Sequence, residues 1–170
     1  ITDISLALGQ DRNIFDNSSK QWRKLRIQNP VIYNRELEKI RNISIDHFKA
    51  ETFEILYPKA KGLNGLEDAL DAIIVQITKA IERGTNIIIL SDRGVNKEFA
   101  PIPSLLACSY VNHQMNRLRK RSYFDIIIES AEPREPHHFA TLFGYGASAI
   151  NPYMVNEIIR VQVREGFITG

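Results

Sequence analysis

Charged residues directly follow two short apolar runs that are typical of strands buried on both faces. Asp92 and Arg93 come after the first run, and Glu129 ends the second, with Arg134 five residues further on. In parallel α/β folds, functional groups lie at the carboxyl ends of strands. One interpretation makes Asp92 and Glu129 an acid–base pair with an arginine as an anion clamp. The simpler interpretation, which we favour, is a buried ion network that holds the loops in place.

Histidine and cysteine offer little further chemistry. His137 and His138 are adjacent, and adjacent residues of a helix point in different directions, so a shared metal site is not expected. The His-Glu-x-x-His pattern is absent. Cys108 is the single cysteine and lies within an apolar helical pattern, so we expect a buried, unreactive side chain. One thiol excludes an internal disulfide and a self-contained four-cysteine metal site.

Two other patterns resemble binding motifs only superficially. Residues 144–147 (GYGA) look like half a phosphate-binding loop, but they follow a predicted helix and precede a predicted strand. A phosphate loop needs the opposite order, so we predict a tight connection. Basic residues cluster around Trp22 (Lys20, Arg23, Lys24 and Arg26) and at 117–121 (Arg117, Arg119, Lys120 and Arg121). Neither cluster is interleaved with stacking aromatics, so we expect solvated surface rather than a nucleic-acid site.

The elements that must position these residues alternate between strand and helix. Strands are predicted over 50–57, 86–91, 124–129 and 147–150, and helices over 36–41, 66–81, 104–119, 137–143 and 152–164. Asn34 is the expected cap of the first helix, and Gly84 is expected to stop the second. The alternation predicts an α/β fold, a mostly parallel sheet with crossover helices. With about four βα units, it resembles a truncated (βα) barrel or a small open sheet.

Bulk properties limit the partners. The chain has 170 residues and a net charge of +2, which gives no general reason to expect nucleic acid or a membrane surface as a partner. No apolar stretch is long enough for a transmembrane helix. We interpret 1–33 as a connecting segment packed on the domain through Leu6, Leu8, Ile14, Phe15, Trp22 and Leu25, and 34–170 as the α/β domain. The first residue, Ile1, and the ordinary composition at the end predict a piece of a longer chain, incomplete at both ends.

Four segments occur together in the order and spacing of one family. They are 89–94 (ILSDRG), 100–107 (APIPSLLA), 132–140 (EPREPHHFA) and 144–153 (GYGA and AINPY). Together they resemble the central domain of the glutamate synthase large subunit, over nearly the whole chain. Two departures are small: Ala131 stands where the family usually has glycine, and Pro136 where it usually has valine or a similar residue.

The resemblance implies a part of an enzyme that makes two L-glutamate from L-glutamine and 2-oxoglutarate, in glutamate biosynthesis and ammonia assimilation. In that family an amidotransferase domain releases ammonia, an FMN domain reduces an iminoglutarate intermediate, and a 3Fe–4S cluster relays electrons, with FAD in some forms. The central domain lies between these sites. The resemblance therefore implies that this fragment binds no cofactor, supplies no catalytic, cofactor-binding or metal residue, and is inactive alone. Its partners would be the amidotransferase and FMN domains of the same chain.

The electron donor and the cellular location can be predicted only indirectly, from residue usage. Residue usage favours Ile, Asn and Lys, which indicates an AT-rich genome such as that of a plastid. We therefore expect reduced ferredoxin as the donor and the chloroplast (plastid) stroma as the location. The alternatives are an NADPH-dependent enzyme of a bacterial cytoplasm, a small independent barrel-like enzyme using Asp92 and Glu129, and a module whose basic residues 117–121 dock an acidic protein such as ferredoxin.

Overall fold

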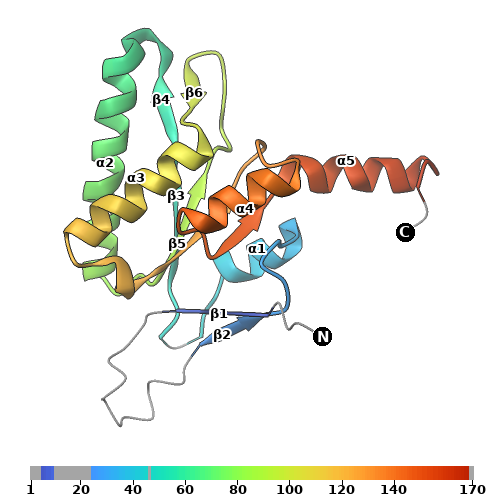
Figure 1. Ribbon diagram of the computed structural model, residues 1–170, viewed down its shortest axis with the longest axis horizontal. Helices are drawn as coiled ribbons and strands as arrows, with labels where there is room; N and C mark the ends of the chain where they lie inside the picture. The colour runs from blue at the N-terminus through green and yellow to red at the C-terminus, as the bar shows by residue number, and fades with distance from the viewer. Residues whose placement is uncertain (1–4, 10–23, 46, 169–170) are drawn as a thin grey trace.

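A four-stranded parallel sheet forms the centre of the molecule (Figure 1). The computed structural model describes residues 5–9, 24–45 and 47–168. The strands lie in the order β3 (Ala50–Glu54), β5 (Ile87–Ser91), β7 (Asp125–Glu129) and β8 (Ala149–Asn151). Spatial order follows chain order, so each strand is joined to its neighbour by one helical crossover. The predicted parallel α/β fold is confirmed, and the described strands form an open sheet rather than a closed barrel.

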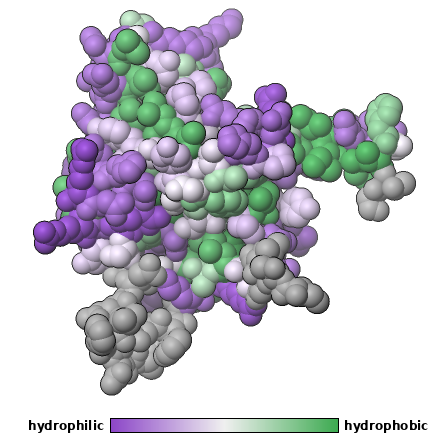
Figure 2. All heavy atoms as spheres, in the orientation of Figure 1, coloured by the Kyte–Doolittle hydropathy of each residue, from purple (hydrophilic) through white to green (hydrophobic). Residues whose placement is uncertain are grey.

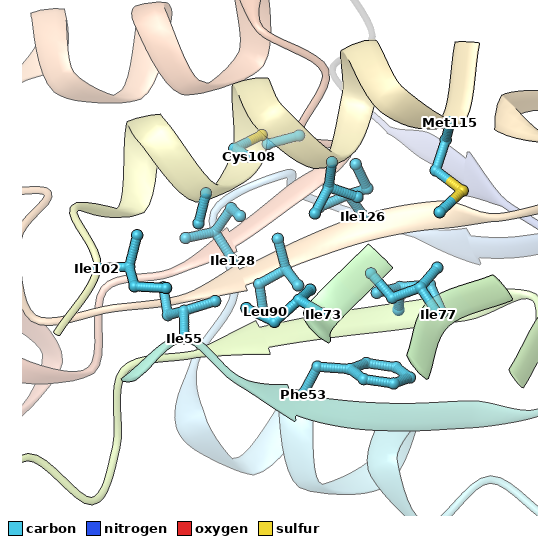
Figure 3. Packing of buried hydrophobic residues seen from close by; sticks show 14 of the residues in the cluster. Phe53, Ile55, Ile73, Ile77, Leu90, Ile102, Cys108, Met115, Ile126 and Ile128 are labelled. Atoms are coloured by element: carbon cyan, nitrogen blue, oxygen red, sulfur yellow. The ribbon is translucent and has the colours of Figure 1, made fainter. Parts of the chain in front are cut away.

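The three crossover helices all cover one face of the sheet. They are α2 (Gly62–Glu82), α3 (Ser104–Arg117) and α4 (Pro136–Gly144). Figure 3 shows their apolar side chains packed on those of the strands, with Ile73 and Ile77 of α2 and Met115 of α3 close to the sheet. A barrel places every crossover helix on its outer wall in the same way. The fold therefore resembles an arc of a barrel wall.

The opposite face would be the interior of such a barrel, and the chain itself fills it. The helix α1 (Asn34–Arg41) packs Leu37 and Ile40 against the strands, together with Leu8 of β1 (Leu6–Leu8). β1 pairs antiparallel with β2 (Leu25–Ile27), a pairing that the sequence patterns did not predict. The predicted anchors Ile14, Phe15 and Trp22, and the cations Lys20 and Arg23, lie outside the described residues. The division between segment and domain at residue 33 stays a prediction.

Residues 30–32 cover the outer edge of β8. The Ile32 N–H donates to the Ile150 carbonyl at 2.9 Å, and the Ile150 N–H donates to the Pro30 carbonyl at 2.8 Å. Val31 and Ile150 form a parallel bridge. An uncovered edge offers unpaired N–H and C=O groups to other chains, so this short segment protects one side of the sheet.

The prediction of a single strand over residues 50–57 is wrong at Ile55. There the chain leaves the parallel sheet, and β4 (Leu56–Pro58) pairs antiparallel with β6 (Phe99–Pro101), where no strand or helix was predicted. Ile55 serves both ladders: its N–H donates to the Ser91 carbonyl, and its carbonyl accepts from the Ile102 N–H, both at 2.8 Å. The strand changes partner because β5 ends at Ser91 and no longer runs beside it.

Helix ends lie within two residues of the predictions, including α3, which ends at Arg117 rather than at 119, with two corrections. The helix predicted over 66–81 starts earlier, at Gly62, and is followed by Gly84 with a φ of +88°, which suits a residue without a Cβ. Asn34 is not a cap, because it is already helical. Tyr33 precedes α1, and its N–H donates to the Glu36 carboxylate at 2.8 Å.

The last helix, α5 (Tyr153–Arg164), projects away from the body of the molecule (Figure 1). None of its residues is buried. No helix of the described residues is long and apolar enough to cross a membrane.

Candidate functional site

A row of polar side chains lies across the carboxyl ends of the strands. Ser91 of β5 is in register with Glu129 of β7, which is in register with Asn151 of β8. All three are buried. Side chains alternate between the faces of a strand, so these three point toward the face that carries α1, together with Ile89 and Ile127. The candidate functional residues were predicted at this end of the sheet.

Glu129 has both carboxylate oxygens occupied by groups of this chain. Arg93 Nε donates to Oε1 at 2.6 Å, and Arg41 Nη2 donates to Oε2 at 2.7 Å. Ser91 Oγ also donates to Oε2, at 2.7 Å. The Glu129 side chain is only 2% exposed, whereas the two arginines are 47% and 29% exposed. Two cations and a hydroxyl therefore compensate one buried carboxylate, which is the predicted ion network.

Asp92 belongs to a different set of contacts. Its Oδ2 accepts from the Ser130 hydroxyl at 2.6 Å and from the Ala131 N–H at 3.0 Å. The Tyr153 hydroxyl lies nearby: burial first, and then the Asp92 carboxylate, raise the pKa of Tyr153 to about 12. Asp92 and Glu129 therefore accept hydrogen bonds from separate sets of side chains.

Arg93 links the two sets. Its guanidinium lies over the Tyr153 ring, 4.0 Å from the centroid, while its Nε holds Glu129. A cation over an aromatic face adds roughly 0.5–1 kcal/mol at a partly exposed position. Arg93 therefore joins the ends of β5 and β7 to the first turn of α5.

The other predicted clamp, Arg134, lies outside the network. It is exposed, makes no ion pair among the described residues, and donates its backbone N–H to His138 Nδ1 at 3.2 Å. His137 is exposed as well. In the same loop, Glu132 Oε2 accepts from the backbone N–H and the hydroxyl of Ser104, at 2.7 and 2.6 Å. That carboxylate caps the start of α3, where a negative charge is favoured.

Three buried polar atoms of the described residues have no hydrogen-bond partner, and all lie at the same end of the sheet. They are Arg41 Nε, Asp92 Oδ1 and Asn151 Oδ1. Tyr153 is near Asp92, but no hydrogen bond of good geometry reaches Oδ1. Unmade hydrogen bonds of buried groups cost about 1–3 kcal/mol each. Such groups are normally completed by water or by further protein.

The remaining candidates have structural roles. Cys108 is fully buried against the sheet in Figure 3, and burial raises its pKa to about 12, as expected of an unreactive thiol. Residues 144–147 form the predicted tight connection, with Gly146 at a φ of +107°. Among the described residues, no three His, Cys, Asp or Glu side chains are grouped as metal ligands would be.

Arg121 corrects the interpretation of the second basic cluster as solvated surface. Its guanidinium donates to Asn112 Oδ1 at 2.7 Å and to the carbonyls of Phe124 and Gly146, at 2.6 and 2.9 Å. It thereby joins the end of α3 to the turn before β8. Arg117 and Arg119 are exposed, as predicted.

Comparison with known proteins identifies the family of this chain. The family model described as the glutamate synthase central domain matches residues 1–169. The chain belongs to the glutamate synthase central domain family. The resemblance carried by the four sequence segments is thereby confirmed.

Relatives of this central domain use different electron donors, according to their names. The chain is 34% identical to the large chain of NADPH glutamate synthase from Bacillus subtilis, over 98% of this chain and 11% of that protein. It is 31% identical to NADH glutamate synthase from Schizosaccharomyces pombe, over 97% of this chain and 8% of that protein. It is also 31% identical to ferredoxin-dependent glutamate synthase 2 from Synechocystis, over 94% and 10%. The chain therefore spans about a tenth of the length of these relatives.

Proposed function

We propose that this central domain is an architectural part of a glutamate synthase and lies between its amidotransferase and FMN domains. The whole enzyme would make two L-glutamate from L-glutamine and 2-oxoglutarate with reduced ferredoxin. The main support for the proposal is that the buried Glu129 carboxylate already accepts hydrogen bonds from Arg41, Arg93 and Ser91.

A catalytic acid or base must come within hydrogen-bond reach of the proton that it transfers. Glu129 is 1% exposed and already accepts three hydrogen bonds from its own chain. Asp92 is 3% exposed and holds the loop that contains Ser130. A small independent enzyme would need these two carboxylates to converge on a substrate, and no observation favours that arrangement.

The proposal assigns FMN, the 3Fe–4S cluster and any FAD to other domains of the enzyme. The residues described here do not fit these groups. A cluster needs several thiolates, and Cys108 is a single buried thiol. A flavin phosphate is held by backbone N–H groups where a strand leads into a helix, whereas the glycines at 144–147 lead from α4 toward β8. The absence of catalytic and cofactor-binding residues from this chain stays a prediction.

Reduced ferredoxin as donor and the plastid stroma as location form the finer part of the proposal. They are supported by the residue usage, by the ferredoxin-dependent relative in Synechocystis and by a relative from Spinacia oleracea named as chloroplastic, at 31% identity. The alternative is an NADPH-dependent enzyme of a bacterial cytoplasm, and the Bacillus subtilis relative supports it.

The test uses the full-length polypeptide that contains this chain. Glutamate formation is measured in parallel with reduced ferredoxin and with NADPH, and ammonia release from glutamine is measured separately. Activity with ferredoxin alone supports the proposed donor, and activity with NADPH alone rejects it. Turnover by the 170-residue chain itself would contradict an architectural role.

Two variants of the full-length enzyme address the strand-end network. We expect Arg93→Ala and Glu129→Ala to reduce glutamine-dependent glutamate formation relative to glutaminase activity, because loosened loops would disturb the faces that meet the neighbouring domains. Glu67→Ala, at an exposed position of α2, is the matched control and should leave the ratio unchanged. A normal ratio in both network variants would show that these loops do not support coupling.

A further inference from the structure

The helix α5 carries a wide apolar arc. Placed on a helical wheel, its polar residues Asn156, Glu157, Arg160 and Arg164 fall on one side, and its apolar residues fill most of the remainder, apart from Gln162. The apolar members are Met154, Val155, Ile158, Ile159, Val161 and Val163. At 3.6 residues per turn they cover roughly 200° of the circumference. We call this surface the α5 arc.

Little of the described chain covers the α5 arc, of which Val155 alone is half-buried. Ile158 and Ile159 are each 46% exposed, Val161 is 44% exposed, and Phe167 just beyond the helix is 80% exposed. Figure 2 shows the projecting helix as a largely hydrophobic surface. An extended apolar surface of this kind normally marks a contact with other protein.

Among the described residues, the hydrogen bonds between α5 and the body come from the first turns of the helix. Asn156 Nδ2 donates to the Ile32 carbonyl at 3.3 Å, and Asn34 Nδ2 donates to the Glu157 carboxylate at 3.1 Å. These polar contacts lie on the polar side of the helix. They fix the direction in which α5 leaves the domain and leave the α5 arc free.

The width of the arc indicates how it is covered. A helix packed on one side against a core shows an apolar stripe of a little over about 100°. The α5 arc is about twice as wide, so a single flat contact would leave much of it in water. A groove that encloses the helix from several sides fits it better. The exposed Tyr33 extends the apolar surface, since a shallow groove between α1 and α5 is lined by Tyr33, Ile159 and Val163.

The occupant follows from the length of the relatives. The chain covers only 8–11% of the glutamate synthases that it matches, and its family model is that of a central domain, which has polypeptide on both sides. We infer that the α5 arc inserts into an apolar groove of a neighbouring domain of the same polypeptide and anchors the central domain there. This inference rests on the proposed function, because it requires the multidomain enzyme.

A second copy of the chain is the competing occupant. Two copies of α5 packed side by side would each cover one stripe of the other and would leave the far side of the arc exposed. Enclosure by a larger domain of the same polypeptide removes more apolar area, and it needs no second molecule.

The test places single cysteines on the two sides of α5 in the full-length polypeptide. Ile158→Cys lies within the arc, and Arg160→Cys lies two residues away, on the opposite side of the helix. Both side chains are exposed in the structure of the 170-residue chain. Maleimide labelling at each cysteine is followed over time by digestion and mass spectrometry, which separates these cysteines from the others in the enzyme.

We expect the cysteine at position 158 to react at least about tenfold more slowly than that at position 160, because it is enclosed. Equal rates would overturn the inference. Slow labelling at position 158 that becomes fast when a dimer is diluted to monomers would also overturn it, since the cover would then be a second copy. Slow labelling that is independent of concentration supports it.

Failure of this inference is distinguishable from failure of the proposed function. Glutamate formation by the wild-type polypeptide tests the function and does not depend on the labelled variants. If the wild type makes glutamate and the two cysteines label equally, only the docking of α5 is wrong. If the wild type makes no glutamate, the labelling rates still report whether the α5 arc is covered.

Discussion

Arg41 and Glu129 are 88 residues apart in the chain, yet Arg41 Nη2 donates to Glu129 Oε2 at 2.7 Å. This contact ties the end of α1 to the end of β7. The same arginine also pairs with Glu38 within α1, so its position is fixed from both sides. A barrel would offer this interior position to a substrate, and here an arginine of the chain occupies it.

Glu129→Gln should therefore lower the free energy of unfolding substantially. The substitution leaves Arg93 without a carboxylate partner, leaves Arg41 with Glu38 alone, and turns an amide NH₂ toward donors. Removal of one partner from a fully buried pair costs about 3–5 kcal/mol, and the partial exposure of both arginines reduces this to about 2–3 kcal/mol. Urea denaturation of the 170-residue chain measures the effect.

Arg93→Ala should lower the free energy of unfolding less than Glu129→Gln does, because Arg93 is more exposed. Its side chain is 47% exposed, and Arg41 and Ser91 still compensate Glu129 in its absence. We expect a loss below about 1 kcal/mol. Equal losses for Glu129→Gln and Arg93→Ala would show that the network is not organised around the buried carboxylate.

Gly146→Ala should destabilise the turn before β8. Gly146 has a φ of +107°, and an added Cβ would lie 2.7 Å from the carboxamide of Asn112. That carboxamide cannot move freely, because it accepts a hydrogen bond from Arg121. We expect a loss of about 2–3 kcal/mol, from strained backbone and overlap together.

Gly144→Ala is the matched control for this turn. Gly144 ends α4, has no positive φ, and has no atom within 4 Å of an added Cβ. Alanine is the better helix former by up to about 1 kcal/mol, so this variant should be neutral or more stable. Thermal denaturation of both variants separates the two effects, and similar melting temperatures would contradict the assignment.

Cys108 should be protected from alkylation in the folded chain. Burial raises its pKa to about 12, so almost no reactive thiolate exists at pH 8. Iodoacetamide should react with it at least about a thousandfold more slowly than in concentrated urea, where the pKa returns to about 8.5. Rapid modification under native conditions would mean that α3 separates readily from the sheet.

Glu51 should make stability depend on pH in the acidic range. Burial acts to raise its pKa, but hydrogen bonds from Thr85, Lys49 and Arg83 outweigh this and lower it below the ordinary value. A lowered pKa in the folded state means that ionised Glu51 stabilises the fold. This contribution is complete above the unfolded pKa of about 4.3 and is lost as the pH falls through the folded pKa.

Glu51→Gln tests this sign directly. At pH 7 the variant should be less stable than wild type by under about 1 kcal/mol, because Lys49 and Arg83 are about half exposed. The difference should shrink as the pH falls below about 4. Urea midpoints of both proteins at about pH 7, 5, 4 and 3 give the comparison, and a difference that grows toward acid would contradict the assignment.

The sequence predicted those elements whose patterns are local. The β-branched runs that became β5 and β7, and the helical spacing that became α2, are decided by residues close in the chain. The break at Ile55 is not local, since the strand changes partner where β5 ends and β6 arrives. A strand as short as β6, which ends at Pro101 and shows no alternation, gives no period to detect.

The candidate site was predicted in part. Asp92, Arg93 and Glu129 were located because strand ends can be read from the pattern. The ion network around Glu129 was expected, but its second cation, Arg41, comes from α1, which lies 88 residues earlier in the chain, and no spacing in the sequence links the two. Arg121 was assigned to solvent because it follows a helix end with other cations, whereas its acceptors lie at Phe124 and Gly146.

The cover that residues 30–32 place on β8 also determines when the domain can finish folding. Val31 pairs with Ile150, so a segment made early during synthesis finds its partner only when the last strand has left the ribosome. Contacts of such long sequence separation form slowly, because loop closure must precede them. Until then β7, an apolar strand, has no neighbour on one side. The interval before β8 arrives therefore leaves an apolar strand edge unpaired during biosynthesis, a condition that favours aggregation.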